Sequence, residues 1–102
     1  MTSGLSARCR WHTVAVGDFV GQAVTCVANM KTALGAAGAG IADVIFVRVL
    51  VASAVRSDLG VVCEFVHDAF GRQDVPGTLM GVTVLGWEDQ LVEVEVVAAL
   101  VD

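Results

Sequence analysis

The chain has 102 residues, of which 56% are hydrophobic and 17% are charged, and its formal net charge is −5. This length provides one domain with one core, and an acidic balance with scattered basic residues disfavours nucleic acid as a partner. Charged residues or glycine interrupt every apolar stretch well before the roughly 18 residues of a membrane span, and no Lys/Arg-flanked signal peptide opens the chain. We therefore expect a single soluble, cytoplasmic domain, residues 1–102, that buries its excess apolar surface against other copies.

The cysteines and histidines give no sign of a metal site. Cys9, Cys26 and Cys63 are odd in number and widely spaced, which is typical of free thiols in a reducing compartment. No Cys-x-x-Cys pair is present, and His12 and His67 lie far apart in sequence. We expect neither a metal nor a cofactor.

The first clear element is a helix. Residues 1–17 have no clear period, and the segment around Trp11 and Val16 fits a short strand or a loop. A helical period runs from Phe19 to about Ala37, with Asp18 as the N-cap and Gly38 as a left-handed C-cap. Its apolar stripe comprises Val20, Ala23, Val24, Val27, Met30 and Leu34. The residues expected away from this stripe are Gln22, Thr25, Asn29 and Lys31.

A central strand and a second helix follow. The β-branched run Val44–Val51 is apolar on both faces, which predicts a central strand whose only charge is Arg48. A helix from Ser57 to Phe70 follows, with Ser57 or Asp58 as its N-cap. Its buried stripe comprises Leu59, Val62, Cys63, Val66, Ala69 and Phe70. The residues expected to face out are Glu64, His67 and Asp68.

The C-terminal third predicts two further strands. A proline turn at 74–77 leads into a strand from Thr78 to Leu85, and after a loop at 86–89 the last strand runs from Leu91 to Leu100. Glu93 and Glu95 alternate with valines, so both carboxylates point to one face. The order predicts an α+β fold, with two helices side by side on one face of the sheet and another copy of the chain covering the other face.

Four segments resemble the Rid family (RidA/YjgF/UK114). Ser3-Gly4 is similar to the family's Ser-Gly-Gln strand end, and Asp43-Val44-Ile45 is similar to its Asp-Val-Val strand. The first helix shares the family's spacing of Gln, Asn, Lys, Leu and Ala-Gly, here at Gln22, Asn29, Lys31, Leu34 and Ala37-Gly38. Pro76 and the closing run 92–98 match in spacing without a gap. The resemblance implies a chorismate-mutase-like fold with a mixed sheet, and a barrel-like homotrimer that binds small molecules between subunits.

The resemblance also implies a reaction. Better-known Rid members hydrolyse enamines and imines of amino acids to 2-oxo acids, using an Arg two residues after the Pro to hold the substrate carboxylate. That position is Thr78 here, while the family's first closing-strand Glu is kept as Glu93, the candidate catalytic residue. The candidate substrate-binding residues carried over from the family are Ser3, Gly4, Cys63 and Thr78. Members usually begin with a hairpin that supplies a cleft aromatic. This chain begins almost at Ser3 and has no Tyr, so we expect either a mis-assigned start or a short, divergent member.

Each candidate also has a purely structural interpretation. Glu93 fits a solvated strand residue, Cys63 a small buried hydrophobe, and Thr78 a β-former. Arg48 either supplies the missing cation or forms an ion pair between subunits.

Two functions therefore remain open, and a third is disfavoured. The first is small-metabolite binding, with weak or altered enamine/imine deaminase activity, and the second is a non-catalytic trimeric scaffold. A ribonuclease would need a basic channel, and the chain has six Lys+Arg against eleven Asp+Glu. A cation near Thr78 distinguishes the first function from the second.

Overall fold

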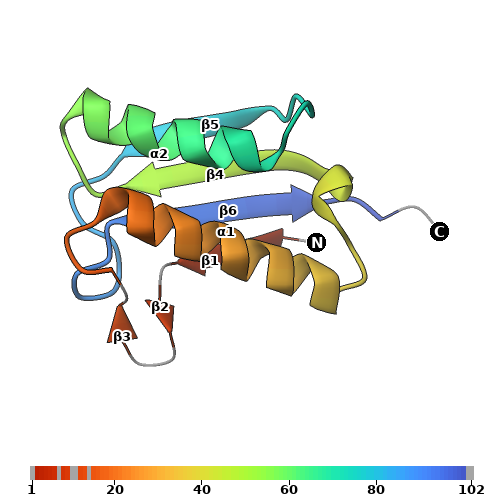
Figure 1. Ribbon diagram of the computed structural model, residues 1–102, viewed down its shortest axis with the longest axis horizontal. Coiled ribbons are helices and arrows are strands. Elements are labelled where there is room, and N and C mark those ends of the chain that lie inside the picture. The colour runs from red at the N-terminus through yellow and green to blue at the C-terminus, as the bar shows by residue number, and fades with distance from the viewer. Residues whose placement is uncertain (1, 7, 10–11, 14, 101–102) are drawn as a thin grey trace.

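The computed structural model describes residues 2–6, 8–9, 12–13 and 15–100 (Figure 1). Its strands are β1 (Thr2–Ser6), β2 (Arg8–Cys9), β3 (His12–Thr13), β4 (Val44–Val51), β5 (Gly77–Gly81) and β6 (Val92–Ala98). Its helices are α1 (Phe19–Ala36), the short 3-10 turn η1 (Ile41–Asp43) and α2 (Arg56–Ala69). Of the uncertain N-terminal segment, Trp11 and Val14 lie outside the described residues.

The main sheet has the order β1-β6-β4-β5. Strand β4 is antiparallel to β6 and parallel to β5, and α2 is the crossover between the parallel pair. Both helices lie side by side on one face of this sheet, and β2 and β3 form a separate antiparallel pair below it (Figure 1). The predicted α+β architecture, mixed sheet and central position of β4 are confirmed.

Helix α1 has the predicted bounds, and four of the six residues predicted for its apolar stripe are buried: Ala23, Val27, Met30 and Leu34. The Asp18 carboxylate accepts a hydrogen bond from the Gly21 N–H at 2.9 Å, and Gly38 has a φ of +78°, so both predicted caps are confirmed. The stripe is rotated, however. Val20 and Val24 are exposed, whereas Gln22 and Cys26 are fully buried. Gln22 enters the interior because backbone groups of the β5–β6 loop satisfy its amide.

Two other boundaries differ from the prediction. Helix α2 begins after Val55 without a side-chain cap, because Asp58 instead accepts a hydrogen bond from the Ser53 hydroxyl at 2.7 Å. Strand β5 ends at Gly81 rather than Leu85. Its partner strand β4 ends at the same level, at Val51, so the later residues have no strand to pair with.

The core lies between the helices and the sheet. Strand β6 alternates as predicted, with Val92, Val94, Val96 and Ala98 buried under the helices and Glu93 and Glu95 on the opposite side. Burying one such side chain contributes about 1.5–3 kcal/mol. The register places four apolar residues on the face that neither helix covers, here called the open face: Phe46, Leu50, Met80 and Val97.

Candidate ligand site

A row of polar residues crosses the open face of the sheet. Arg48 on β4 pairs in register with Glu95 on β6 and with Thr78 on β5, and Glu95 pairs in turn with Gly4 on β1. Directly paired residues on neighbouring strands have side chains about 5 Å apart on the same face. The sheet therefore places Thr78, where the resemblance would put a carboxylate-binding Arg, beside Arg48.

Arg48 is partly engaged by its neighbour. Its Nη1 lies 3.2 Å from the Glu95 Oε2, and 44% of the Arg48 side chain is exposed. Among residues 15–100 the guanidinium forms no second ion pair. A guanidinium carries five N–H donors in a planar fork, so one contact to Glu95 leaves donors for another acceptor. It is also the only Lys or Arg of β4, β5 and β6.

Glu93 lies on the same face, one step along β6 from this row. It pairs with Leu50, which pairs with Met80, so its carboxylate has apolar neighbours. Burial, and secondarily the charge of Glu95, raises the pKa of Glu93 above its ordinary value. A carboxylate that keeps its proton to higher pH is better matched to proton transfer near neutrality.

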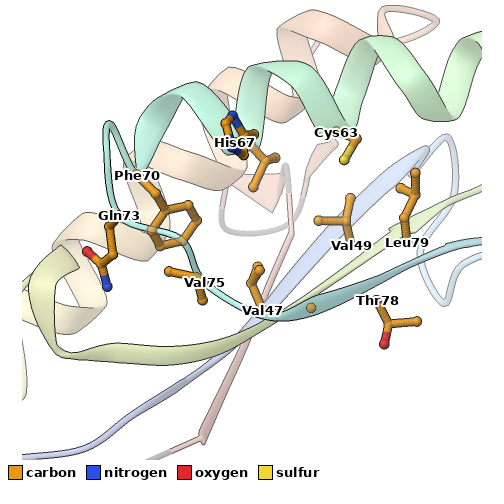
Figure 2. A pocket seen from close by; sticks show the side chains of 11 residues that line it. Val47, Val49, Cys63, His67, Phe70, Gln73, Val75, Thr78 and Leu79 are labelled. Atoms are coloured by element: carbon orange, nitrogen blue, oxygen red, sulfur yellow. The ribbon is translucent and has the colours of Figure 1, made fainter.

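Cys63 lies on the other side of the sheet. Its thiol lines a pocket of about 170 Å³ between α2 and the β4–β5 edge. Figure 2 shows Cys63, Val49 and Leu79 directed into this pocket, while the Thr78 side chain points away from it. Thr78 borders the pocket but presents its hydroxyl to the open face. The structure therefore does not bring Cys63 together with Glu93.

The remaining candidates lie at the far edge of the sheet. Ser3 pairs with Val96 and Gly4 with Glu95 on β1, whereas Thr78 lies on β5, the opposite edge. Within one chain the carried-over residues are thus divided among the two edge strands, the inner strand β6 and helix α2. Gly4, Glu93 and Thr78 share the open face with Arg48, whereas Ser3 and Cys63 do not.

Several features of the site escaped the sequence pattern. His67 is exposed as predicted, but it also lines the pocket one helical turn from Cys63. The register of β5 against β4, which carries Thr78 beside Arg48, has no signal in a single sequence.

In the part of the chain that the structure describes, no cluster of three or more His, Cys, Asp or Glu could hold a metal ion. No described helix is long and apolar enough to cross a membrane.

Fold and open-face residues together define a small α+β domain with a polar row on an uncovered sheet. The profile of the family described as Endoribonuclease L-PSP matches residues 1–100, and the chain belongs to this family, also called the Rid or YjgF family. No curated protein matches the chain in a sequence search.

Solved structures agree with this assignment. A protein of unknown function of the conserved Rid family from Yersinia pestis is 28% identical, with a TM-score of 0.87 over 97% of this chain and 78% of that one. A YjgF/YER057c/UK114 family member from Mycobacterium tuberculosis is also 28% identical, with a TM-score of 0.79 over 96% and 75% of the two chains. RidA from an Antarctic Psychrobacter species shares the fold at 22% identity, with a TM-score of 0.81 over 97% and 80%.

Proposed function

We propose that this chain is a Rid-type protein that binds a small metabolite on the open face of its sheet, with Arg48 as the anchor for an anionic group. The observation that carries this proposal is the register pair Arg48–Thr78. A cation stands beside the position that has lost the family's Arg. An exposed arginine with unused donors is well suited to a carboxylate, which it can bind bidentately.

A homotrimer completes this proposed site. Strands β1 and β5 are the two edges of the sheet, and every residue of β5 is exposed. An edge strand of this kind has unpaired backbone groups, and the open face beside it carries apolar side chains such as Leu50 and Met80. Packing copies around these surfaces would bring Ser3 and Gly4 of one subunit near Thr78 of the next, where a small ligand could lie between them.

Imine hydrolysis by this site is expected to be weak or absent. Thr78 offers one neutral hydroxyl, and such a contact has a net value of about 1 kcal/mol, less than a charge-assisted bidentate pair. Arg48 approaches from the neighbouring strand and is held by Glu95, so a carboxylate bound there is displaced relative to Glu93. A displacement of about 1 Å in a reacting group can cost about a hundredfold in rate.

Binding and turnover can be measured separately. Calorimetry with 2-oxobutanoate tests the anchor, and we expect Arg48→Gln to weaken binding at least about tenfold, the value of a charged hydrogen bond. Arg72→Gln, an exposed arginine just after α2, is the matched control and should change nothing. Equal binding by the wild type and Arg48→Gln would refute the anchor.

For turnover, the decay of 2-iminopropanoate produced by an amino-acid oxidase is followed with and without the protein. Thr78→Arg should raise the rate above that of the wild type, and a second change, Glu93→Ala, should remove the gain. Full activity in the wild type would contradict the expected loss of catalysis.

A non-catalytic trimeric scaffold is the alternative, and the Arg48–Glu95 pair gives it some support because that pair already neutralises the cation. Light scattering at low micromolar concentration tests the trimer. A trimer that binds no 2-oxo acid, with or without Thr78→Arg, would favour the scaffold.

A further inference from the structure

The pocket between α2 and the β4–β5 edge is separate from the open-face site. Figure 2 shows it on the helix side of the sheet, and its volume is about 170 Å³. Its apolar wall is formed by Val47, Val49, Val66, Phe70, Val75 and Leu79. Val49, Val66 and Phe70 belong to the buried core, so this wall is held in place by packing rather than by a mobile loop.

The lining is almost free of charge. None of the eleven residues that surround the pocket is Lys, Arg, Asp or Glu, and its polar side chains are those of Cys63, His67, Gln73 and Thr78. Gln73 already donates its amide N–H to the Val44 carbonyl at 3.0 Å, and the Thr78 hydroxyl points to the other face. A charged ligand would lose hydration here without gaining an ionic partner, which is costly. An uncharged ligand loses little.

The size of the pocket sets the size of its occupant. In another protein, an engineered cavity of about 150 Å³ lined by Leu, Ile and Phe stays dry and binds benzene. The present pocket has a similar volume and a similar wall, but it opens at the edge of the sheet.

Gly77 keeps this edge of the pocket in shape. A Cβ at Gly77 would collide with the backbone carbonyl and side chain of Val47, so β5 can lie this close to β4 only with glycine there. The wall at this point is therefore backbone, with no side chain to fill the space.

We infer that this pocket is a second binding site, for an uncharged aromatic or branched aliphatic molecule of about six to eight non-hydrogen atoms. The site lies on the opposite face of the sheet from the proposed anion site, and Thr78 stands on the boundary between the two. Cys63 and His67 lie one helical turn apart on the same wall. Because the Cys63 thiol lines the pocket, a bound molecule should change its reactivity.

The test uses toluene and its charged analogue benzoate with the full chain, followed by methyl-resolved NMR. Toluene should shift the methyl signals of Val49, Val66 and Leu79 saturably, and benzoate should bind at least about tenfold more weakly, because burying an unpaired carboxylate is unfavourable. Cys63→Phe should fill the pocket and abolish the toluene response. Val61→Phe, on the exposed side of the same helix, is the matched control and should retain it. If Cys63→Phe does not fold, the smaller Cys63→Met provides the same comparison.

A thiol assay gives a second readout. In a Cys9→Ser background, N-ethylmaleimide should modify Cys63, and toluene should slow that reaction several-fold. Cys26 should stay unmodified, because burial raises the pKa of its thiol to about 12 and the side chain is fully enclosed. Arg48→Gln should leave the toluene response unchanged, which separates this site from the proposed anion site.

Four results would overturn the inference. The first is that toluene shifts only the signals of open-face residues such as Leu50 and Met80, and the second is equal affinity for toluene and benzoate. The third is undiminished toluene binding by a folded Cys63→Phe or Cys63→Met variant. The fourth is that the pocket methyl groups contact a second copy of the chain and do not respond to toluene.

Discussion

Replacing Gln22 should lower the free energy of unfolding more than replacing most other polar residues. It is fully buried, and its Nε2 donates to the Asp89 carbonyl at 2.9 Å and to the Ala15 carbonyl at 3.4 Å. Its Oε1 accepts a hydrogen bond from the Leu91 N–H at 2.7 Å. The amide thereby joins the start of α1 to the loop that leads into β6, since Leu91 is the residue just before that strand.

Gln22→Met keeps the shape of the side chain and removes these hydrogen bonds. Each buried group left without a partner costs about 1–3 kcal/mol. We expect a total loss of about 2–4 kcal/mol, a large part of the roughly 5–15 kcal/mol typical of a domain. The midpoint of thermal unfolding should fall by about 8–32 °C, at about 4–8 °C per kcal/mol for a chain of this size.

Urea denaturation at one fixed protein concentration measures this loss, because the stability of an oligomer depends on concentration. Gln73→Met is the control. It removes a single hydrogen bond, to the Val44 carbonyl, from a half-buried side chain and should cost about 1 kcal/mol. If Gln22→Met loses no more unfolding free energy than Gln73→Met, the hydrogen bonds of Gln22 do not stabilise the fold as expected.

Two further predictions concern the core and the open face. Leu34→Asp and Val66→Asp should each prevent folding, because each buries an unpaired carboxylate, whereas Val24→Asp on the exposed side of α1 should still melt cooperatively by circular dichroism. If Leu34→Asp folds, the assigned helix face is wrong. Glu93→Gln should increase stability at pH 7. Since the pKa of Glu93 is raised in the fold, its contribution is fully favourable below its ordinary pKa and is lost as pH rises through the raised value. The gain should therefore vanish below about pH 4, and a destabilised variant at pH 7 would contradict it.

Sequence periodicity was sufficient for the elements that pack by apolar burial alone. The caps of α1, the central position of β4 and the alternation of β6 all follow from local residue pattern, and the structure has them as predicted. The predicted face of α1 was correct at Ala23, Val27, Met30 and Leu34 but wrong at its edge, because an apolar count places Val24 inside and Gln22 outside. The backbone groups of Ala15, Asp89 and Leu91, none of which belongs to the helical period, make a buried glutamine favourable.

The ends of elements and the pairing of strands were harder for the same reason. Residues beyond Gly81 keep a strand-like composition, but β4 has ended, so they find no partner. Strand β1 had no period of its own and forms because β6 offers it an edge. For the candidate site, the common face of Glu93 and Glu95 was predictable from alternation. That Thr78 lies beside Arg48 could not be predicted, because it depends on the register between β4 and β5, which only the folded sheet defines.

The pairing of β1 with β6 has a consequence for the order of folding. It runs from Thr2 opposite Val97 to Ser6 opposite Glu93, and so joins the two ends of the sequence. The unit β4-α2-β5 is local in sequence and can form early. The contact between β1 and β6 closes the longest loop in the chain, so the loss of chain entropy on closing it favours its formation last. Hydrogen-bonded along one side only, β1 is also the strand that can leave while the rest stays folded. Once it leaves, β6 presents an empty edge that the same strand of another copy fits equally well, so this topology permits strand exchange between copies of the chain.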